Sequence, residues 1–367
     1  MKNRYPLALL FLLATASVLP AQNRLKPGFQ VQEYLEMLGV AAMQYDTIEL
    51  KERPPLGPEY KFVYRSPVGG LFNRWQLFVR SDKVAVIDIR GTTTDMPSWA
   101  ENFYAAMVPA TGSITLNDST NFEYKLANDP KAMVHIGWVI GLGSLAPTIL
   151  TQLRAQYASG VREFLLMGHS QGAAINFLLR SYLHYLMERG DLPKDLILKT
   201  YCSAAPKPGN LFYTYDYDYI TRNGWGLTVV NAADWVPETP FSLQTLDDFN
   251  PTNPFRDVKT ALRKQPLFVR LYAGNIYRKL NKRSQKSQRT FEKYLGGLVS
   301  KVIRKSMPQF QPPRYEHSSN YMRAGVPIVL QPDETYRREY PEDPKKIFQH
   351  HFFAPYYSLA KRIYGSN

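Results

Sequence analysis

The residues best suited to chemistry lie in the stretch LLMGHSQGAA, residues 165–174. Gly168 and Gly172 flank Ser170, a short apolar run leads into this motif, and a helix-like run leads out of it. A serine between a strand and a helix lies on a tight turn that raises its hydroxyl above the sheet, and the glycines are needed because side chains would collide there. An ordinary Gly-Ser turn is the alternative. The context favours Ser170 as a nucleophile on a turn formed by Gly168, His169 and Gly172.

A serine hydroxyl attacks well only when a base takes its proton and an acid orients that base. Asp234 is the last residue of the stretch LTVVNAAD, directly after its apolar part. We therefore expect it at the carboxyl end of a buried strand, where the sites of open parallel sheets lie. Asp191 and Asp195 are expected at the opposite edge. Asp216 and Asp218 lie in a tyrosine-rich stretch, which we interpret as a solvated loop. Asp234 is therefore the predicted acid.

Four histidines follow Ser170, and imidazole is the side chain whose pKa lies nearest neutrality. His184 falls within a predicted helix, and His317 lies in the polar stretch YEHSSN. His350 and His351, in FQHHFFAPYY, follow the last predicted strand, from which a ring can reach the turn at the serine. The residues alone leave the choice between His350 and His351 open.

The negative charge that develops on an attacked carbonyl oxygen requires backbone N–H donors. One donor is expected from Gln171, the residue after the nucleophile, and the other from a loop that follows an earlier strand. The stretch IDIRGTTTD provides such a loop, in which Gly91 allows a turn and Thr92 offers both an N–H group and a hydroxyl. Thr92 and Gln171 are the predicted oxyanion donors.

The elements that must position these residues alternate along the chain. Apolar patterns predict helices over 29–48, 136–160, 171–190 and 345–364, and strands over 72–80, 83–91, 162–168, 195–206, 224–240 and 321–333. Residues 92–134 are predicted as mixed loop and short helix. Alternating strands and helices indicate an α/β fold with a mainly parallel central sheet flanked by helices.

A basic segment interrupts this alternation before the last strand. Residues 256–305 contain fifteen Lys and Arg against Asp257 and Glu292, so they carry +13 of the net charge of +14. We predict a helical insertion over about 250–312. In TFEKYLGGLVSKVIRKS (290–306) the apolar residues fall on one helical stripe, which favours a helix docked on the core. The alternative is an arm that contacts an anionic membrane surface; no nucleic-acid partner is expected.

Residues 1–21 read as a secretory signal peptide. Lys2 and Arg4 precede the apolar run LALLFLLATASVL, and a small residue allows cleavage after Ala21. We therefore expect a secreted or periplasmic protein whose residues 22–367 form a single domain. Cys202 is the only cysteine, so no intramolecular disulfide can form.

Several stretches, in order, resemble the class 3 lipases, the fungal-type triacylglycerol lipase family of the α/β-hydrolases. They are VIDIRGTTT with SWAENF, VHIGW, LLMGHSQGAA, YCSAAPKPGN, VVNAADWVPETP and YMRAGVPIVL. The resemblance covers roughly residues 30–245 and 315–362. Ala205, where a glycine-containing stretch is usual, and the basic insertion depart from the family pattern and leave the substrate class open.

This resemblance implies an enzyme that cleaves carboxylic esters without a metal or organic cofactor. Ser170 would be the nucleophile, Asp234 the orienting acid, and Thr92 and Gln171 the oxyanion donors. Family members often end with His, four residues and then Tyr, and His351 fits this spacing with Tyr356, whereas the runner-up His350 does not. Acylglycerols are the favoured substrates, and phospholipids, short-chain esters and polysaccharide esters are alternatives. A non-catalytic surface-binding protein is the alternative from another class.

Overall fold

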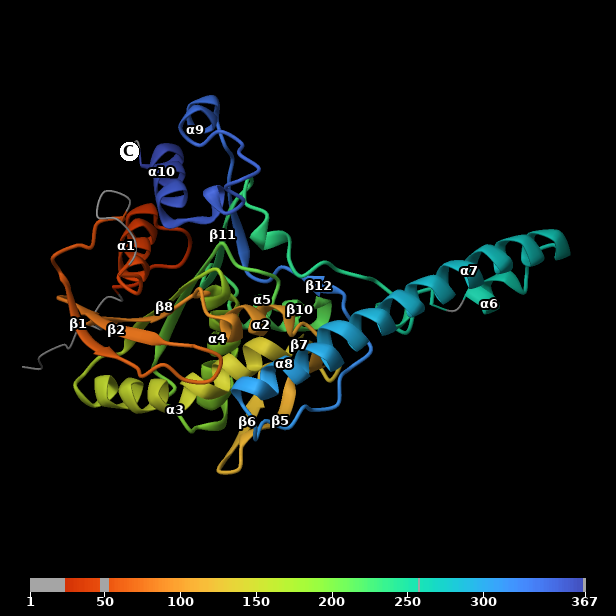
Figure 1. The fold of residues 1–367 in the computed structure, drawn as a ribbon, viewed down its shortest axis with the longest axis horizontal. Coiled ribbons are helices and arrows are strands. Elements are labelled where there is room, and N and C mark those ends of the chain that lie inside the picture. Colours follow the sequence, from red (N-terminus) through yellow and green to blue (C-terminus); the bar gives the residue numbers. More distant parts are fainter. Residues whose placement is uncertain (1–23, 47–52, 257, 366–367) are drawn as a thin grey trace, which may run out of the picture.

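A seven-stranded sheet lies at the centre of the computed structural model, which describes residues 24–46, 53–256 and 258–365 (Figure 1). The predicted signal peptide lies outside the described residues. The strand order is β1-β2-β3-β8-β9-β11-β13; β1, β2 and β3 pair antiparallel, and all pairs from β3 to β13 are parallel. This sheet confirms the predicted α/β class. Its strands are β1 Tyr60–Arg65, β2 Trp75–Arg80, β3 Val84–Ile89, β8 Glu163–His169, β9 Ile197–Ser203, β11 Gly226–Asn231 and β13 Val326–Leu330.

Helices cover both faces of the sheet, which is why its central strands are mostly apolar and almost wholly buried. Every residue of β3, β8 and β11 is buried, as expected for parallel strands packed on two sides. The largest apolar core includes residues of α3 (Ile136–Ala158) and α4 (Gln171–Arg189), and a second includes residues of α1 (Val31–Ala42) and α10 (Phe353–Tyr364). The predicted helices thus form the two outer layers.

Helix α3 is long and apolar enough to cross a membrane by length and composition alone, and it is the one such helix in the described part of the chain. In its most apolar window 67% of the residues are buried. Trp138, Leu142 and Leu145 are almost inaccessible to solvent and belong to the core shared with α4. The apolar composition of α3 is therefore accounted for by packing inside the fold.

Residues 92–134 contain more strand than the sequence predicts. Besides α2 (Met96–Phe103) they form β4 (Met107–Pro109), β5 (Thr111–Asn117), β6 (Thr120–Lys125) and β7 (Met133–His135). Strands β4 and β7 are only three residues long and pair in a small sheet with β10 (Gly209–Asn210) and β12 (Tyr321–Met322). Strands this short show no sequence periodicity, because they depend on partners distant in the chain.

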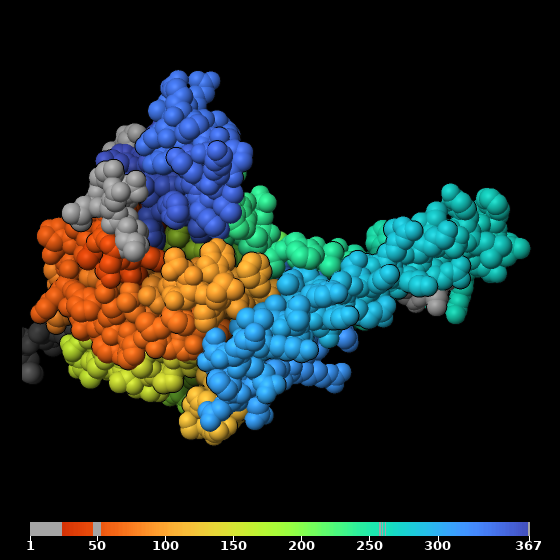
Figure 2. Space-filling view, viewed as in Figure 1, coloured from red at the N-terminus to blue at the C-terminus, as the bar shows by residue number. Residues whose placement is uncertain are grey.

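The described part of the predicted insertion contains three helices, α6 (Val258–Leu262), α7 (Leu267–Glu292) and α8 (Val299–Ser306), with a π-helical turn, Lys293–Leu298, between the last two. Figures 1 and 2 show the outer part of α7, with α6 beside it, projecting from the body of the molecule. We call residues 255–285 the arm and residues 286–298 its root.

The prediction that the apolar residues of 290–306 form one helical stripe was wrong. Phe291 and Ile303 are buried, but Tyr294, Leu298 and Val302 are 39–52% exposed. The π-helical turn adds a residue to one turn of the helix and so rotates the apolar positions onto different faces.

Two further segments differ from prediction. The stretch predicted as a solvated loop is α5 (Leu211–Ile220), and Asp216 accepts hydrogen bonds from the Tyr185 hydroxyl and the Asn128 N–H group. The predicted C-terminal helix begins late, because Gln349–His351 form a 3-10 turn before α10. The remaining elements are α9 (Glu334–Glu339) and the 3-10 turns Val236–Glu238 and Leu246–Asp248.

Candidate active site

Ser170 lies on a strained turn between β8 and α4. Its φ of 59° and ψ of −131° are unfavourable for a residue with a Cβ, and such strain persists only where the surroundings enforce it. The two glycines allow the turn: a Cβ on Gly168 would lie 2.4 Å from the Gly172 carbonyl oxygen, and one on Gly172 would lie 2.1 Å from the Ile89 carbonyl oxygen. Packing of the turn against β3 therefore requires glycine at both positions and directs the Ser170 hydroxyl outward.

Three residues predicted from the sequence come together at this turn. His351 Nε2 lies 2.8 Å from Ser170 Oγ, and His351 Nδ1 lies 2.8 Å from Asp234 Oδ2. Asp234 follows the end of β11 and is buried, and the His351 side chain is 10% exposed. Because the carboxylate accepts at Nδ1, the ring carries its proton there, and Nε2 is left as an acceptor for the serine hydroxyl.

Two further groups hold the Asp234 carboxylate. The Tyr356 hydroxyl donates to Oδ2 at 2.8 Å, and the Val236 N–H group donates to Oδ1 at 3.0 Å. Hydrogen bonds fix the plane of a carboxylate, so Asp234 faces the His351 ring in one orientation. This contact gives a physical reason for the spacing between His351 and Tyr356.

His350 points away from the serine. Its Nδ1 lies 2.8 Å from the Tyr336 hydroxyl, and its carbonyl oxygen accepts from the Asn231 amide at 3.1 Å. The 3-10 turn places the two adjacent rings on different sides of the chain. Of the other histidines, His317 is exposed and contacts Glu292, and His184 lies within α4.

His169, beside the nucleophile, supports the backbone of His351. Its Nε2–H group donates to the His351 carbonyl oxygen at 2.7 Å, and its Nδ1 lies 3.0 Å from Ser203 Oγ. Ser203 Oγ in turn lies 2.8 Å from the Tyr34 hydroxyl. Burial, followed by the nearby His351 ring, lowers the pKa of His169 to about 3, so this ring stays neutral and keeps both contacts.

The two predicted oxyanion residues lie beside Ser170. Gln171 is the first residue of α4, where backbone N–H groups have no partner within the helix. Thr92 lines the same pocket as Ser170. A Cβ on Gly91 would approach Ser170 Cβ to 3.4 Å, so the loop after β3 passes directly by the serine.

Asn102, which is not among the residues predicted from the sequence, connects these two residues. Its amide nitrogen donates to Thr92 Oγ1 at 2.9 Å, and its side-chain oxygen accepts from Gln171 Nε2 at 2.9 Å. Its carbonyl oxygen lies 3.2 Å from Nε2 of the buried His135. The only signal in the sequence was an amide in the short helical stretch after the Thr92 loop.

A pocket of about 1010 Å³ opens above Ser170 and His351. Aromatic side chains line much of it, and Phe348 packs between Trp99 and Trp235 with ring centroids 5.8 and 5.3 Å apart. Part of this lining reaches solvent, since Phe103 is 56% and Phe352 61% exposed. A pocket of this kind suits a substrate with hydrocarbon parts. No group of three His, Cys, Asp or Glu side chains suited to a metal occurs among the described residues.

Comparison with known proteins finds a family match over part of the chain. Residues 86–244 match the family model described as Lipase (class 3), a span that includes Ser170 and Asp234. Over these residues the chain is similar to the class 3 lipase family. The match confirms the resemblance seen in its motifs and supports a carboxylic ester hydrolase with the α/β-hydrolase fold. His351 and the arm lie outside the matched span.

Solved structures with a similar arrangement are fungal lipases at low identity. A triacylglycerol lipase from Penicillium expansum is 15% identical with a TM-score of 0.40; the match covers 58% of this chain and 75% of that one. A lipase from Rhizopus microsporus var. chinensis is 19% identical with a TM-score of 0.40; the match covers 65% of this chain and 79% of that one. The Lip2 lipase from Yarrowia lipolytica is 15% identical with a TM-score of 0.42; the match covers 57% of this chain and 73% of that one. No curated protein sequence matches the chain.

Proposed function

We propose that this enzyme hydrolyses acylglycerol esters, with Ser170 as nucleophile, His351 as general base and Asp234 as the acid that orients the base. The observation that supports this most strongly is the continuous hydrogen-bonded path from Ser170 Oγ through the His351 ring to the Asp234 carboxylate. The three residues come from separate elements, and their order along the chain is the order expected of this fold. This geometry is what a serine requires to attack an ester.

The reaction proceeds in two halves. As Ser170 Oγ attacks the ester carbonyl carbon, its proton passes to His351 Nε2, and Asp234 stabilises the resulting imidazolium. The tetrahedral intermediate collapses, the imidazolium gives the proton to the leaving alcohol, and an acyl-serine remains. Water then attacks the acyl-serine with His351 again as the base, which releases the carboxylic acid and restores Ser170.

The developing oxyanion is held by the N–H groups of Thr92 and Gln171 in this proposal. Asn102 supports the arrangement, because its amide donates to Thr92 Oγ1 and leaves the Thr92 hydroxyl hydrogen available to the oxyanion. Removing one such donor usually lowers the rate by about 10²–10³.

The first experiment measures hydrolysis of p-nitrophenyl esters of increasing chain length by the wild type and by Ser170→Ala. The wild type should hydrolyse them, with a preference for medium or long acyl chains because of the aromatic pocket, and Ser170→Ala should be inactive. Activity confined to acetyl esters would favour a short-chain or polysaccharide-ester esterase, and higher activity on phospholipids than on acylglycerols would favour a phospholipase. Survival of activity in Ser170→Ala would refute the mechanism. No activity on any ester would favour the surface-binding alternative.

We further propose that residues 1–21 are removed on export and that residues 22–367 form one hydrolase domain with an insertion at about 250–312. The charged and apolar pattern of the first 21 residues supports the export step. N-terminal sequencing of the protein recovered outside the cytoplasm should begin at Gln22, and recovery of an uncleaved protein that starts at Met1 would contradict it.

We also propose that residues 256–305 bring the enzyme to an anionic membrane surface. At the outer end of α7, Leu267, Phe268, Leu271 and Tyr272 are 62–78% exposed. The rings of Phe268 and Tyr272 lie parallel, with centroids 6.3 Å apart. Exposed apolar side chains so close together mark an interaction surface.

The positive charge of the arm favours an anionic membrane as its partner. Arg263, Lys264 and Arg270 are exposed around the apolar end, and Arg278 and Lys279 follow along α7. Each Lys or Arg near an anionic membrane contributes about 1 kcal/mol to binding. A second copy of the chain would bring the same positive charge against these residues, so arm-to-arm dimerisation is opposed.

Vesicle sedimentation tests this contact. The wild type should bind vesicles that contain phosphatidylglycerol, and binding to phosphatidylcholine vesicles should be at least about tenfold weaker. The double variant Phe268→Ser/Leu271→Ser should lose most binding, whereas Val63→Ser, which removes an exposed apolar residue from β1, should not. Equal binding to both vesicle types would refute the proposal, and a dimer in solution that the double variant abolishes would favour self-association instead.

A further inference from the structure

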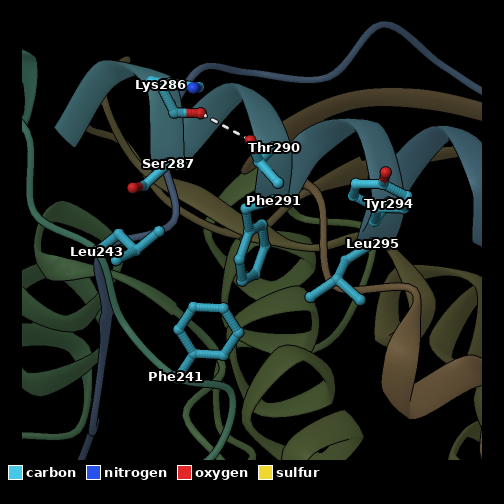
Figure 3. Close-up of a pocket in the computed structure, with 8 residues that line it drawn as sticks. All are labelled: Phe241, Leu243, Lys286, Ser287, Thr290, Phe291, Tyr294 and Leu295. Carbon is cyan, nitrogen blue, oxygen red and sulfur yellow. Dashed lines mark hydrogen bonds between the residues drawn. The ribbon is translucent and has the colours of Figure 1, made fainter. Parts of the chain in front are cut away.

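A second groove, of about 520 Å³, lies at the root of α7 (Figure 3). Phe241 and Leu243 of the loop after Asp234 form one side, and Phe291 and Leu295 of the root form the other. Figure 3 shows these four side chains gathered beneath the α7 helix, with the Lys286 ammonium group directed away from them. The insertion therefore contributes a concave surface to the body of the enzyme.

This groove adjoins the catalytic pocket, because Phe241 and Leu295 line both. The root is fixed at this junction: the Ala106 N–H group donates to the Leu295 carbonyl oxygen at 3.2 Å. Gly296 packs so closely that a Cβ there would lie 2.9 Å from Ala106 Cβ. The junction thus belongs to the packed body of the protein.

The groove lining fits a hydrocarbon chain. The Phe291 ring is buried and lies edge-on to Phe241, with ring centroids 5.1 Å apart. Among the described residues that line the groove, Lys286 is the only charged one and none is a carboxylate. A lysine can place its alkyl stem along an apolar surface while its ammonium group stays in water. These features offer no counter-ion to a cationic ligand and favour an uncharged alkyl chain.

We propose that the groove at the root of α7 binds a second acyl chain of a lipid whose ester carbonyl lies at Ser170. The inference rests on the proposed ester hydrolysis and makes its substrate class more specific, namely a lipid with at least two acyl chains. One chain occupies the aromatic pocket, and the other passes Phe241 and Leu295 into the groove. A single-chain ester of the same alcohol leaves the groove unfilled.

The test compares kcat/KM for 1,2-dihexanoylglycerol and 1-hexanoylglycerol, both kept as monomers in solution so that membrane contact by the arm cannot contribute. Each methylene removed from water is worth roughly fourfold in binding, so the wild type should prefer the diester by at least about tenfold. Two ester bonds alone give a factor of about two. Thr290→Trp and Ser287→Phe place rings in the groove from exposed positions on α7. Each should lower the ratio of kcat/KM for the diester to kcat/KM for the monoester to about two.

Arg289→Trp is the matched control, because it adds the same ring to an exposed position of the same helix outside the groove lining. It should keep the wild-type ratio. The inference is overturned if the wild type shows a ratio near two, or if Thr290→Trp and Ser287→Phe both keep the wild-type ratio. If the wild type hydrolyses neither ester, the proposed function itself has failed and the groove assignment falls with it.

Discussion

The adjacent histidines give the sharpest test of the site, because alanine substitution of either one removes a similar ring with very different consequences. In His351→Ala the serine loses the ring nitrogen 2.8 Å from its hydroxyl, and Asp234 loses the group that it orients. Removal of a base in such a triad lowers kcat by about 10⁴–10⁶, equivalent to roughly 5–8 kcal/mol in the activation free energy. Residual activity near the background rate is expected.

In His350→Ala the losses are one hydrogen bond to the Tyr336 hydroxyl, at 2.8 Å, and a 3.8 Å contact of Nε2 with the exposed Glu342 carboxylate. That hydroxyl keeps the Asn231 amide as a partner at 2.7 Å, so no buried polar group is left unpaired. The unfolding free energy should fall by about 1 kcal/mol, and kcat/KM should stay within about threefold of wild type.

The assay is p-nitrophenyl butyrate hydrolysis by both variants, with thermal denaturation as the control for folding. Both melting temperatures should lie within a few degrees of wild type. The reasoning is refuted if His350→Ala is the inactive variant, or if His351→Ala keeps more than about a hundredth of the wild-type kcat while folded.

Three further predictions follow from the contacts of the site. Tyr356→Phe removes a hydrogen bond to the buried Asp234 carboxylate and should lower the unfolding free energy by about 1.5–3 kcal/mol in urea titrations; an unchanged midpoint would count against that bond. Burial lowers the pKa of His135 to about 3, so the stability that its neutral ring contributes is present above pH 6.5 and is lost as pH falls towards 3. Between pH 6.5 and 5 this loss is about 2 kcal/mol, and His135→Gln should show a correspondingly shallower pH dependence. Gly172→Ala would place a Cβ 2.1 Å from the Ile89 carbonyl oxygen and should abolish activity and lower the melting temperature; a fully active variant would contradict the packing described.

The positions of Ser170 and Asp234 could be predicted because each lies within three residues of the end of a buried strand. Local apolar runs identify such strands, and parallel strands bring their carboxyl ends to one edge of the sheet. The choice between His350 and His351 could not be made from residue types, since adjacent rings differ only in the direction that the 3-10 turn gives them. Spacing to Tyr356 favoured His351, and the shared contact with Asp234 gives that spacing its physical meaning.

Other features depend on contacts between distant segments. Asn102 acquires its role only when the loop after β3 lies beside the start of α4. The short strands β4 and β7 are held by pairing rather than by an apolar pattern of their own. The prediction of one apolar stripe over residues 290–306 was wrong because it assumed a regular α-helix. The chain instead forms a π-helical turn where Gly296 packs against Ala106.

The most direct test of the central claim is covalent labelling of the serine. A fluorophosphonate ester should modify one residue per chain, Ser170, with loss of esterase activity in proportion to labelling, and peptide mass spectrometry locates the adduct. His351→Ala should be labelled at least about 10³-fold more slowly, because the nucleophile lacks its base. Ester hydrolysis that continues after complete labelling of Ser170, or inactivation with the adduct on another residue, would contradict the account.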